Sequence, residues 1–280
     1  MQTRPTVPGM TIPGRAETTD NFGTPLPPPT DEDPLREAPA VVFPPAADAD
    51  PEGVVAAGGD LSPSTLISAY RQGIFPWFND DRLLLWWSPD PRFVLNPPAL
   101  HVPRRLARSV KTSRLLITVD QDFPGVIRAC ARVHRPGQDG TWITVGMEEA
   151  YIRLHQRGLA HSVEAWDGPR LVGGYYGVHL GQVFFGESMF ALEPDASKIA
   201  FVHGTRAMHR AGIRLIDCQM ETEHLSRFAA RNVPRDSFLR ALASALLPVT
   251  RKTWIAVIHE LAPHVGAPDS VGQADGADAQ

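Results

Sequence analysis

The sequence predicts a mixed α+β protein, with a smaller β-rich N-terminal domain ahead of a larger α/β domain. Three apolar, β-branched runs within residues 161–190 are joined by Asp167-Gly168 and Gly181-Gln182, which are turn sequences typical of antiparallel hairpins. A helical stretch, a strand and a second helical stretch follow over residues 197–247. Hairpins followed by alternating helices and strands are typical of a mixed α/β domain.

The composition is that of a globular protein: 43% of the 280 residues are hydrophobic, which is enough for a substantial core. The net charge of −4 argues against a surface coated with nucleic acid but permits a local basic patch. The two cysteines, Cys130 and Cys218, exclude a disulfide scaffold. No run approaches the ~18 apolar residues of a membrane span. The N-terminus also lacks a basic start followed by an apolar stretch, so we expect a cytoplasmic protein that contacts no membrane.

Residues 1–40 contain a large share of the 27 prolines and a single aromatic residue, Phe22. Such a segment buries too little apolar surface to offset the entropy of ordering, so we expect a disordered Pro-rich extension. We expect the small N-terminal domain at 41–100, the larger domain at 101–250 and a polar tail at 251–280.

The small domain contains a well-marked helix and a cluster of aromatic residues. Ser62-Pro63 is a favourable helix start and Gly73 a favourable helix end. Three of the six tryptophans follow within a dozen residues. Trp86 and Trp87 lie in a leucine-rich run and are interpreted as core residues, with a ligand wall as the alternative. Trp77 lies beside prolines and polar residues and is the better candidate for a ligand pocket.

The segment 103–114 is basic and contains no acidic residue. Helical spacing places its cations on one face and Leu106 and Val110 on the opposite side. Such a run is either a solvated face or a phosphate contact, and the sequence favours neither. The cations are Arg104, Arg105, Arg108, Lys111 and Arg114.

Further strands are expected at 92–95, at the end of the small domain, and at 115–119 in the larger domain. The larger domain is also expected to contain helices at 123–132, 146–158, 197–211 and 235–247, with a loop at 135–140. Tyr151 falls on the apolar stripe of the helix at 146–158 and is by default a core tyrosine.

Two apolar strands, at 183–190 and 214–219, contain polar residues where a buried strand should have none. Glu187 interrupts the first strand. In the second, alternation places Asp217 and Gln219 on one face. A carboxylate that is buried without a partner costs several kcal/mol. Two acids and an amide in two strands therefore favour a functional site over structural carboxylates.

Eight segments in the same order resemble the leucyl/phenylalanyl-tRNA–protein transferase family, from about Phe43 to Leu239. The segments are Gly58–Ser62, Arg71–Phe78, Trp86–Arg92, Gly140–Thr144, Glu149–Tyr151, Gly186–Phe190, Ala196–Lys198 and Leu215–Gln219. The resemblance implies a GNAT-like larger domain. It also implies a cytoplasmic aminoacyltransferase that moves leucine or phenylalanine (methionine less well) from aminoacyl-tRNA to a protein N-terminus that begins with arginine or lysine, which creates a degradation signal.

The residues matched by the resemblance can be assigned roles in that chemistry. An aminoacyl ester is already activated, so the reaction needs positioning and proton removal, and neither a cofactor nor a metal. We hypothesise that Asp217 polarises Gln219, whose side-chain oxygen orients the attacking amine, and that Glu187 holds either the amine or the cationic acceptor side chain. The expected walls of the side-chain pocket are Phe184, Met189 and Ile216. The residues expected to stack on the terminal adenosine are Trp77, Trp142 and Tyr151, with plain core packing as the alternative for each. The basic segment 103–114 is the expected tRNA contact.

Two rivals share parts of this pattern. A CoA-dependent N-acyltransferase needs a glycine-rich loop at a helix start, and the loop 192–198 has no glycine and two acids. A non-enzymatic RNA- or N-terminus-binding adaptor would not need Asp217 and Gln219 together. The ten histidines show no metal-ligand spacing. The loops at 135–139 and 220–228 depart from the family pattern, and these departures leave the acceptor preference more open than the reaction.

Overall fold

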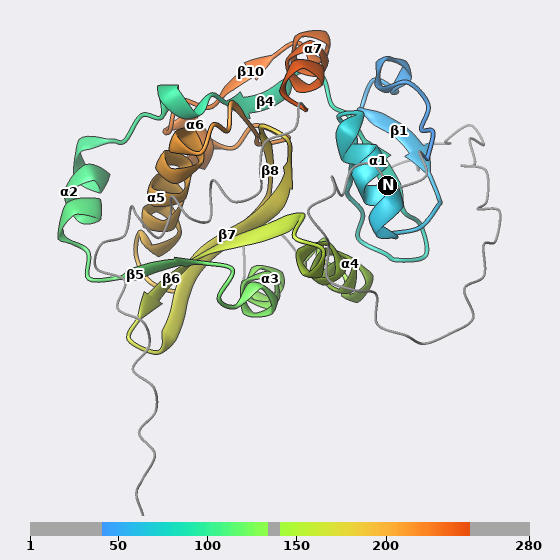
Figure 1. The fold of residues 1–280 in the computed structure, drawn as a ribbon. Helices are drawn as coiled ribbons and strands as arrows, with labels where there is room; N and C mark the ends of the chain where they lie inside the picture. Colours follow the sequence, from blue (N-terminus) through green and yellow to red (C-terminus); the bar gives the residue numbers. More distant parts are fainter. Residues whose placement is uncertain (1–40, 134–140, 247–280) are drawn as a thin grey trace, which may run out of the picture.

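The computed structural model describes residues 41–133 and 141–246. The expectations for the extension 1–40, the loop at 135–140 and the tail at 251–280 concern residues outside these ranges. Within the described ranges the chain is a mixed α+β protein, as predicted (Figure 1). None of its described helices is long and apolar enough to cross a membrane.

A small three-stranded sheet lies in the N-terminal part of the described chain. Its strand order is β1 (Val54–Ala57), β3 (Leu85–Trp87), β2 (Phe75–Pro76), and helix α1 (Pro63–Arg71) connects β1 to β2. The predicted helix start is confirmed, because Ser62 Oγ accepts a hydrogen bond of 3.3 Å from the amide of Thr65. Trp86 is fully buried, which confirms its interpretation as a core residue.

A seven-stranded sheet forms the larger part of the fold, in the order β10-β4-β9-β8-β7-β6-β5. The strands are β4 (Arg92–Leu95), β5 (Leu116–Val119), β6 (Ala160–Asp167), β7 (Arg170–Leu180), β8 (Val183–Ala191), β9 (Leu215–Asp217) and β10 (Arg231–Val233). The antiparallel meander β6-β7-β8 is confirmed. β8 and β9 pair in parallel and are connected by helix α5 (Ala196–Arg210).

Helices cover both faces of this sheet (Figure 1). The helix α2 (Arg104–Thr112) and α5 pack on one face, where Leu106 and Phe201 share a core with Phe184. The helices α3 (Phe123–Arg132) and α4 (Val145–Gln156) pack on the other face, in a core that contains Phe185 and extends into the small domain. The short α6 (Glu223–Ser226) precedes β10, and α7 (Arg235–Ala245) ends the described chain.

Two local features of the large sheet differ from the expected regular strands. β9 ends at Asp217, because Gln219 has a left-handed backbone conformation with φ of 63°. In β8, Gly186 and Ser188 pair with consecutive residues of β7, which leaves Glu187 as the extra residue of a β-bulge. A bulge reverses the alternation of side chains beyond it. Phe184 and Met189 are five positions apart, yet both therefore contact the core on the α5 side.

Candidate active site

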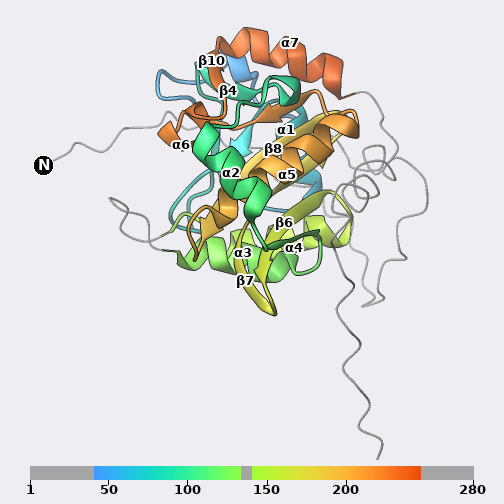
Figure 2. The same ribbon diagram turned by 90° about the vertical axis from the view of Figure 1, so that its left-hand side faces the viewer.

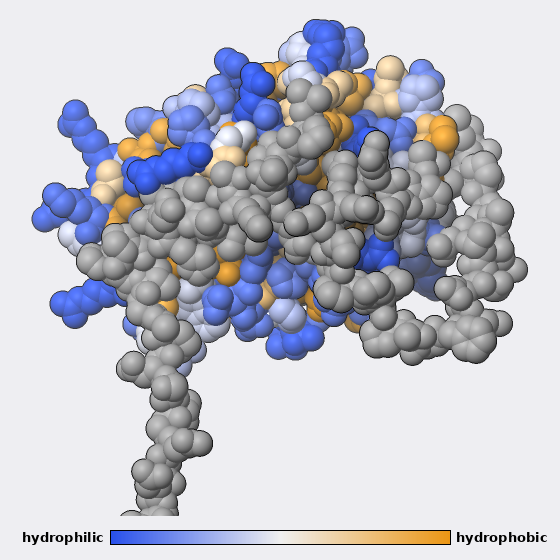
Figure 3. Space-filling model, in the orientation of Figure 1, coloured by the Kyte–Doolittle hydropathy of each residue, from blue (hydrophilic) through white to orange (hydrophobic). Residues whose placement is uncertain are grey.

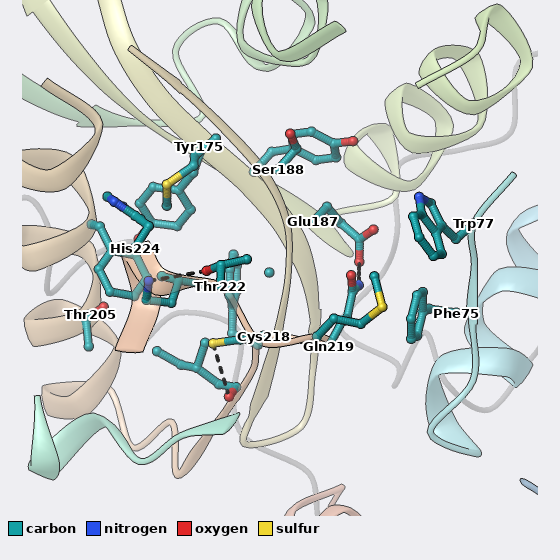
Figure 4. Close-up of a pocket in the computed structure, with 18 of the residues that line it drawn as sticks. Phe75, Trp77, Tyr175, Glu187, Ser188, Thr205, Cys218, Gln219, Thr222 and His224 are labelled. Atoms are coloured by element: carbon teal, nitrogen blue, oxygen red, sulfur yellow. Dashed lines mark hydrogen bonds between the residues drawn. The ribbon is translucent and has the colours of Figure 1, made fainter. Parts of the chain in front are cut away.

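A cavity of about 440 Å³ lies where β8 loses β9 as its partner (Figure 4). The two strands pair only as far as Phe185 and Asp217, although β8 continues to Ala191. Residues of β8, α5, the segment after β9 and the small domain line the space that opens there. Figure 4 shows Glu187 and Gln219 pointing toward each other, with Phe75 and Trp77 beside them. The end of the sheet pairing thus creates the cavity and exposes polar groups inside it.

Glu187 is held by three hydrogen-bond donors from three different elements. Its Oε1 accepts from the Tyr70 hydroxyl at 2.7 Å and from Gln219 Nε2 at 2.9 Å, and its Oε2 accepts from the Tyr151 hydroxyl at 3.0 Å. The two tyrosine hydroxyls also contact each other. The cluster has three oxygen–oxygen contacts: Tyr70 with Tyr151, Tyr70 with Glu187, and Tyr151 with Glu187. Two protons are available for these contacts when Glu187 is ionised, and three when it is protonated. The cluster is therefore fully hydrogen-bonded only with a protonated Glu187.

Burial raises the pKa of Glu187 to about 7 from its ordinary value of 4.5. Hydrogen bonds from Tyr70 and Tyr151 favour the ionised form but only partly offset the loss of hydration. Burial, together with the nearby charge of Glu187, raises the pKa of each tyrosine well above 10, so both remain protonated donors. Glu187 is consequently a carboxyl group that changes its charge near neutral pH.

Asp217 does not contact the side chain of Gln219, contrary to the hypothesis drawn from strand alternation. Its Oδ1 instead accepts a 2.9 Å hydrogen bond from the backbone amide of Gln219. Both carboxylate oxygens are engaged by Arg92, with Nε–Oδ1 at 2.8 Å and Nη2–Oδ2 at 2.6 Å. Both side chains are completely buried. Because β9 ends at Asp217, the alternation argument does not extend to Gln219, and Asp217 acts on the backbone that carries Gln219.

Arg92 fixes this arrangement from the neighbouring strand. Its Nη1 donates to the carbonyl of Gly73 at 3.1 Å, and its guanidinium lies 4.8 Å from the ring centre of Phe75 and 4.5 Å from that of Phe238. A buried charge is tolerated when it is paired and fully hydrogen-bonded. The Arg92–Asp217 pair therefore connects the end of α1, β4 and β9 directly behind the cavity.

The three expected pocket walls, Phe184, Met189 and Ile216, all line the cavity. Ile216 stands opposite Phe184 in the parallel β8–β9 register, and the bulge at Glu187 brings Met189 to the same face. The resulting lining is largely apolar, with the Glu187–Gln219 pair at one side. This arrangement suits a ligand with an apolar side chain next to a polar reacting group.

The three aromatic residues expected to stack on an adenine occupy different environments. Trp77 and Trp142 are partly exposed and line the cavity. Trp77 also packs edge to face on Trp87, whose Nε1 donates to the Trp77 carbonyl at 2.6 Å. Tyr151 is fully buried and does not line the cavity; its hydroxyl holds Glu187 instead. Only the two tryptophans are therefore placed to meet a planar group.

The basic helix α2 lies outside the cavity, on the same side of the large sheet as α5. Leu106 is buried against the core, and Val110 packs beside it, as the helical spacing predicts. Arg104, Arg105, Arg108, Lys111 and Arg114 are exposed. The Ser109 hydroxyl lies 3.3 Å from the carboxylate of Asp195, at the start of α5. This contact fixes α2 relative to a helix whose other side lines the cavity.

Two sequence models of one family match the chain, each described as leucyl/phenylalanyl-tRNA protein transferase: the N-terminal domain model over residues 59–90 and the main model over residues 94–243. Curated proteins named leucyl/phenylalanyl-tRNA–protein transferase are similar over most of their length. The protein from Anaeromyxobacter dehalogenans (strain 2CP-C) is 58% identical over 213 residues, which cover 76% of this chain and 91% of the relative. The protein from Pseudomonas fluorescens (strain Pf0-1) is 52% identical, over 77% of this chain and 96% of the relative.

The chain belongs to the leucyl/phenylalanyl-tRNA–protein transferase family. The matched ranges and the strand pairing of this family member both differ from the domain boundary expected at residue 100. β4 was expected in the small domain at 41–100, but it pairs with β9 and β10 in the large sheet. We therefore propose that the division falls near residue 91, between the two matched ranges.

Sequence reasoning missed two residues that shape the site of this transferase. Arg92 opens an otherwise apolar strand, Arg-Phe-Val-Leu, and a charge at that place was a usable signal. Tyr70 lies in α1, and the sequence indicated no role for its hydroxyl. No local pattern could have assigned its hydroxyl to Glu187, 117 positions further along the chain.

Proposed function

We propose that this protein transfers leucine or phenylalanine, and methionine less well, from aminoacyl-tRNA to the α-amino group of proteins that begin with arginine or lysine. The new N-terminal residue would then act as a degradation signal. The observation that carries the proposal is the hydrogen-bonded Glu187, with a pKa near 7, at the side of an apolar cavity. A proton acceptor of that strength beside a pocket for an apolar side chain suits attack by an amine on an aminoacyl ester.

The side chain of the donor amino acid would enter between Phe184, Met189 and Ile216. A hydrophobic pocket separates substrates by only about 1–3 kcal/mol per methylene. The walls must therefore exclude branching at Cβ by shape, which would reject valine and isoleucine. Trp77 and Trp142, at the cavity lining, would stack on the terminal adenosine, where each stack contributes roughly 1–3 kcal/mol.

The proton balance of the reaction fits Glu187 and Gln219. Gln219 donates through Nε2 to Glu187, so its side-chain oxygen remains available to accept a hydrogen bond from the acceptor's amine. Glu187 takes one proton from the ammonium, whose pKa of roughly 8 lies about one unit above that of Glu187, so the transfer costs only about 1.4 kcal/mol. The amine nitrogen then bonds to the ester carbon. As the carbon–oxygen ester bond breaks, a second proton passes from nitrogen to the ribose oxygen.

Asp217 serves as a positioning residue in this proposal. Its charge is neutralised by Arg92, and its link to the site is the hydrogen bond from the backbone amide of Gln219. Asp217 thus stabilises the left-handed backbone that directs the Gln219 side chain toward Glu187. This replaces the hypothesis that Asp217 polarises the Gln219 amide group directly.

The exposed cations of α2 would contact the phosphates of tRNA. An enzyme that accepts tRNAs of several amino acids needs phosphate contacts without base readout. If three to five phosphates are neutralised, the logarithm of the binding constant falls with the logarithm of salt concentration with a slope of roughly −2 to −4. Binding that does not respond to salt would contradict this assignment.

We further propose the GNAT-like fold for the larger domain, supported by the parallel β8–β9 pair that α5 connects and by the cavity where this pair ends. We also propose that the chain acts as a monomer.

One assay tests the proposed reaction. The full chain is mixed with labelled leucyl-tRNA and with peptides that begin with Arg, Lys, Ala or Asp, in the absence of CoA. Label should appear on the Arg and Lys peptides only. Label on none of the peptides would refute the proposed reaction, and label on the Asp peptide but not the Arg peptide would refute the acceptor preference.

A further inference from the structure

A second cavity, of about 660 Å³, lies at the opposite end of β9 from Gln219. It is formed between the turn that connects α5 to β9, the end of β4, β10 and helix α7. Its polar lining consists of Asn96, His209, Arg214, Arg231 and Ser237. We refer to it as the α5–α7 cavity.

The charge of the α5–α7 cavity is of one sign. Of the described residues that line it, none is an Asp or Glu. Arg214 and Arg231 are both exposed, and within residues 41–133 and 141–246 neither forms an ion pair with a carboxylate. Some other exposed arginines, such as Arg170 and Arg227, are paired with acids. Two unpaired guanidinium groups in one hollow favour an anionic ligand, because guanidinium matches phosphate geometry.

The α5–α7 cavity lies at the end of a segment that is rich in cations. Residues 196–216 contain Lys198, Arg206, Arg210 and Arg214 and no acid. Arg206 and Arg210 lie exposed on α5. Figure 2 shows α2 and α5 side by side on the face turned to the viewer, with α7 above them. In Figure 3 long hydrophilic side chains project from the edge of the molecule where Figure 1 places α2.

The distances along the elements match a single extended ligand. α5 has 15 residues and is therefore roughly 22 Å long; α2 contacts its start at Asp195, and Arg210 lies at its end. From Arg214 to Gln219 the chain advances five residues, or at most roughly 16 Å at strand spacing. A nucleic acid carries regularly spaced phosphates over such lengths, whereas a small anion would occupy only one of these positions.

We propose that the α5–α7 cavity is a second phosphate-binding site for the tRNA backbone, in which Arg214 and Arg231 hold phosphate groups while α2 holds others. This inference rests on the proposed function for the identity of the ligand. Contacts at the two ends of α5 would fix the orientation of the tRNA, so that its aminoacylated end enters the active-site cavity at the other end of β9.

The test uses the full chain and compares wild type with the double variant Arg214→Glu/Arg231→Glu. Binding of fluorescently labelled tRNA is measured by anisotropy from about 50 to about 300 mM salt, a range that brackets physiological ionic strength. Removing two phosphate contacts should make the log–log salt slope shallower by about 1.4 to 1.8 and weaken binding at about 0.1 M salt by roughly 25- to 60-fold. Transfer from leucyl-tRNA should fall relative to transfer from a minimal donor, leucyl-adenosine, which is too short to reach the cavity.

Two further variants separate the causes. Arg214→Lys/Arg231→Lys keeps both charges and should largely retain the salt slope. Arg157→Glu reverses an exposed charge after α4, outside α2 and the α5–α7 cavity, and should leave tRNA binding unchanged. An unchanged slope in the Glu double variant would overturn the proposal, as would an equal loss in the Lys double variant or in Arg157→Glu. tRNA binding decides this inference even if wild type transfers leucine to no peptide, an outcome that would refute only the proposed function.

Discussion

Replacing Glu187 by Gln should remove an ionisation near pH 7 from the rate of transfer. Glutamine has the shape of a protonated glutamic acid and can donate to a tyrosine oxygen, so it mimics the neutral form that satisfies the Tyr70–Tyr151–Glu187 contacts. The variant should therefore fold, yet it cannot take a proton from the acceptor's ammonium. The perturbation isolates the proton-accepting step from the architecture of the site.

The size of the effect follows from the pKa of about 7. A carboxyl group with that pKa is roughly 3% ionised at about pH 5.5 and roughly 90% ionised at about pH 8. The acceptor's own amine, with a pKa of roughly 8, titrates equally with both enzymes. The ratio of wild-type to variant kcat/KM should therefore rise roughly 30-fold over this range, measured with leucyl-tRNA and an arginine-initiated peptide. A ratio that stays constant with pH would refute the assignment of Glu187 as the proton acceptor.

The same ionisation predicts how stability depends on pH. The pKa of Glu187 is about 7 in the folded chain and 4.5 ordinarily, so between these values the folded state binds the additional proton. The free energy of unfolding should accordingly fall as the pH rises from about 4.5 to about 7, by at most about 3 kcal/mol. Urea denaturation of wild type and of Glu187→Gln across this range measures the pH dependence of the free energy of unfolding in each protein. An equal pH dependence in the two proteins would show that the pKa of Glu187 is not raised by folding.

Three further predictions concern the surroundings of Glu187. Tyr151→Phe removes a hydrogen bond that favours the ionised carboxylate, so the pH–rate inflection should move to higher pH; a shift to lower pH would contradict the hydrogen-bond direction. Asp217→Asn leaves Arg92 buried with its charge unpaired and should cost about 3–5 kcal/mol in urea denaturation, whereas adding Arg92→Met should recover part of that loss; strictly additive losses would show that the two residues are not coupled. Trp142→Ala should raise the KM for leucyl-tRNA roughly 5- to 150-fold with little change in kcat, and a loss confined to kcat would exclude a stacking role.

The sequence predicted the helices and the hairpins because their signals are local. The helix start at Ser62-Pro63, the helix 123–132 and the turns at 167–168 and 181–182 each depend on residues a few positions apart. The same is true of α2, whose cations and apolar anchors separate by helical period alone. Polar residues in the apolar strands also drew attention to Glu187, Asp217 and Gln219, since burial of such groups without partners is costly.

What the sequence could not determine is which partner each polar group has. Alternation assumes a regular strand, and two local departures from regularity rearranged the site: the bulge at Glu187 and the left-handed backbone at Gln219. As a result Gln219 contacts Glu187, and Asp217 contacts Arg92. Both departures depend on contacts with distant residues: Tyr70 and Tyr151 hold Glu187, and Arg92 holds the Asp217 carboxylate that accepts from the Gln219 amide.

The sequence by itself therefore determined the elements, the kinds of residue available for chemistry, and, through the order of its motifs, a family that the comparisons confirmed. Only the tertiary structure decided that Tyr70 and Tyr151 hold Glu187, that Arg92 neutralises Asp217, and that Arg214 and Arg231 share a cavity. The physical reason is the range of the interactions. Helix and turn formation depends on neighbours along the chain. Hydrogen-bond partners, desolvation and the pKa of Glu187 instead depend on residues that folding brings together from 32 to 125 positions away.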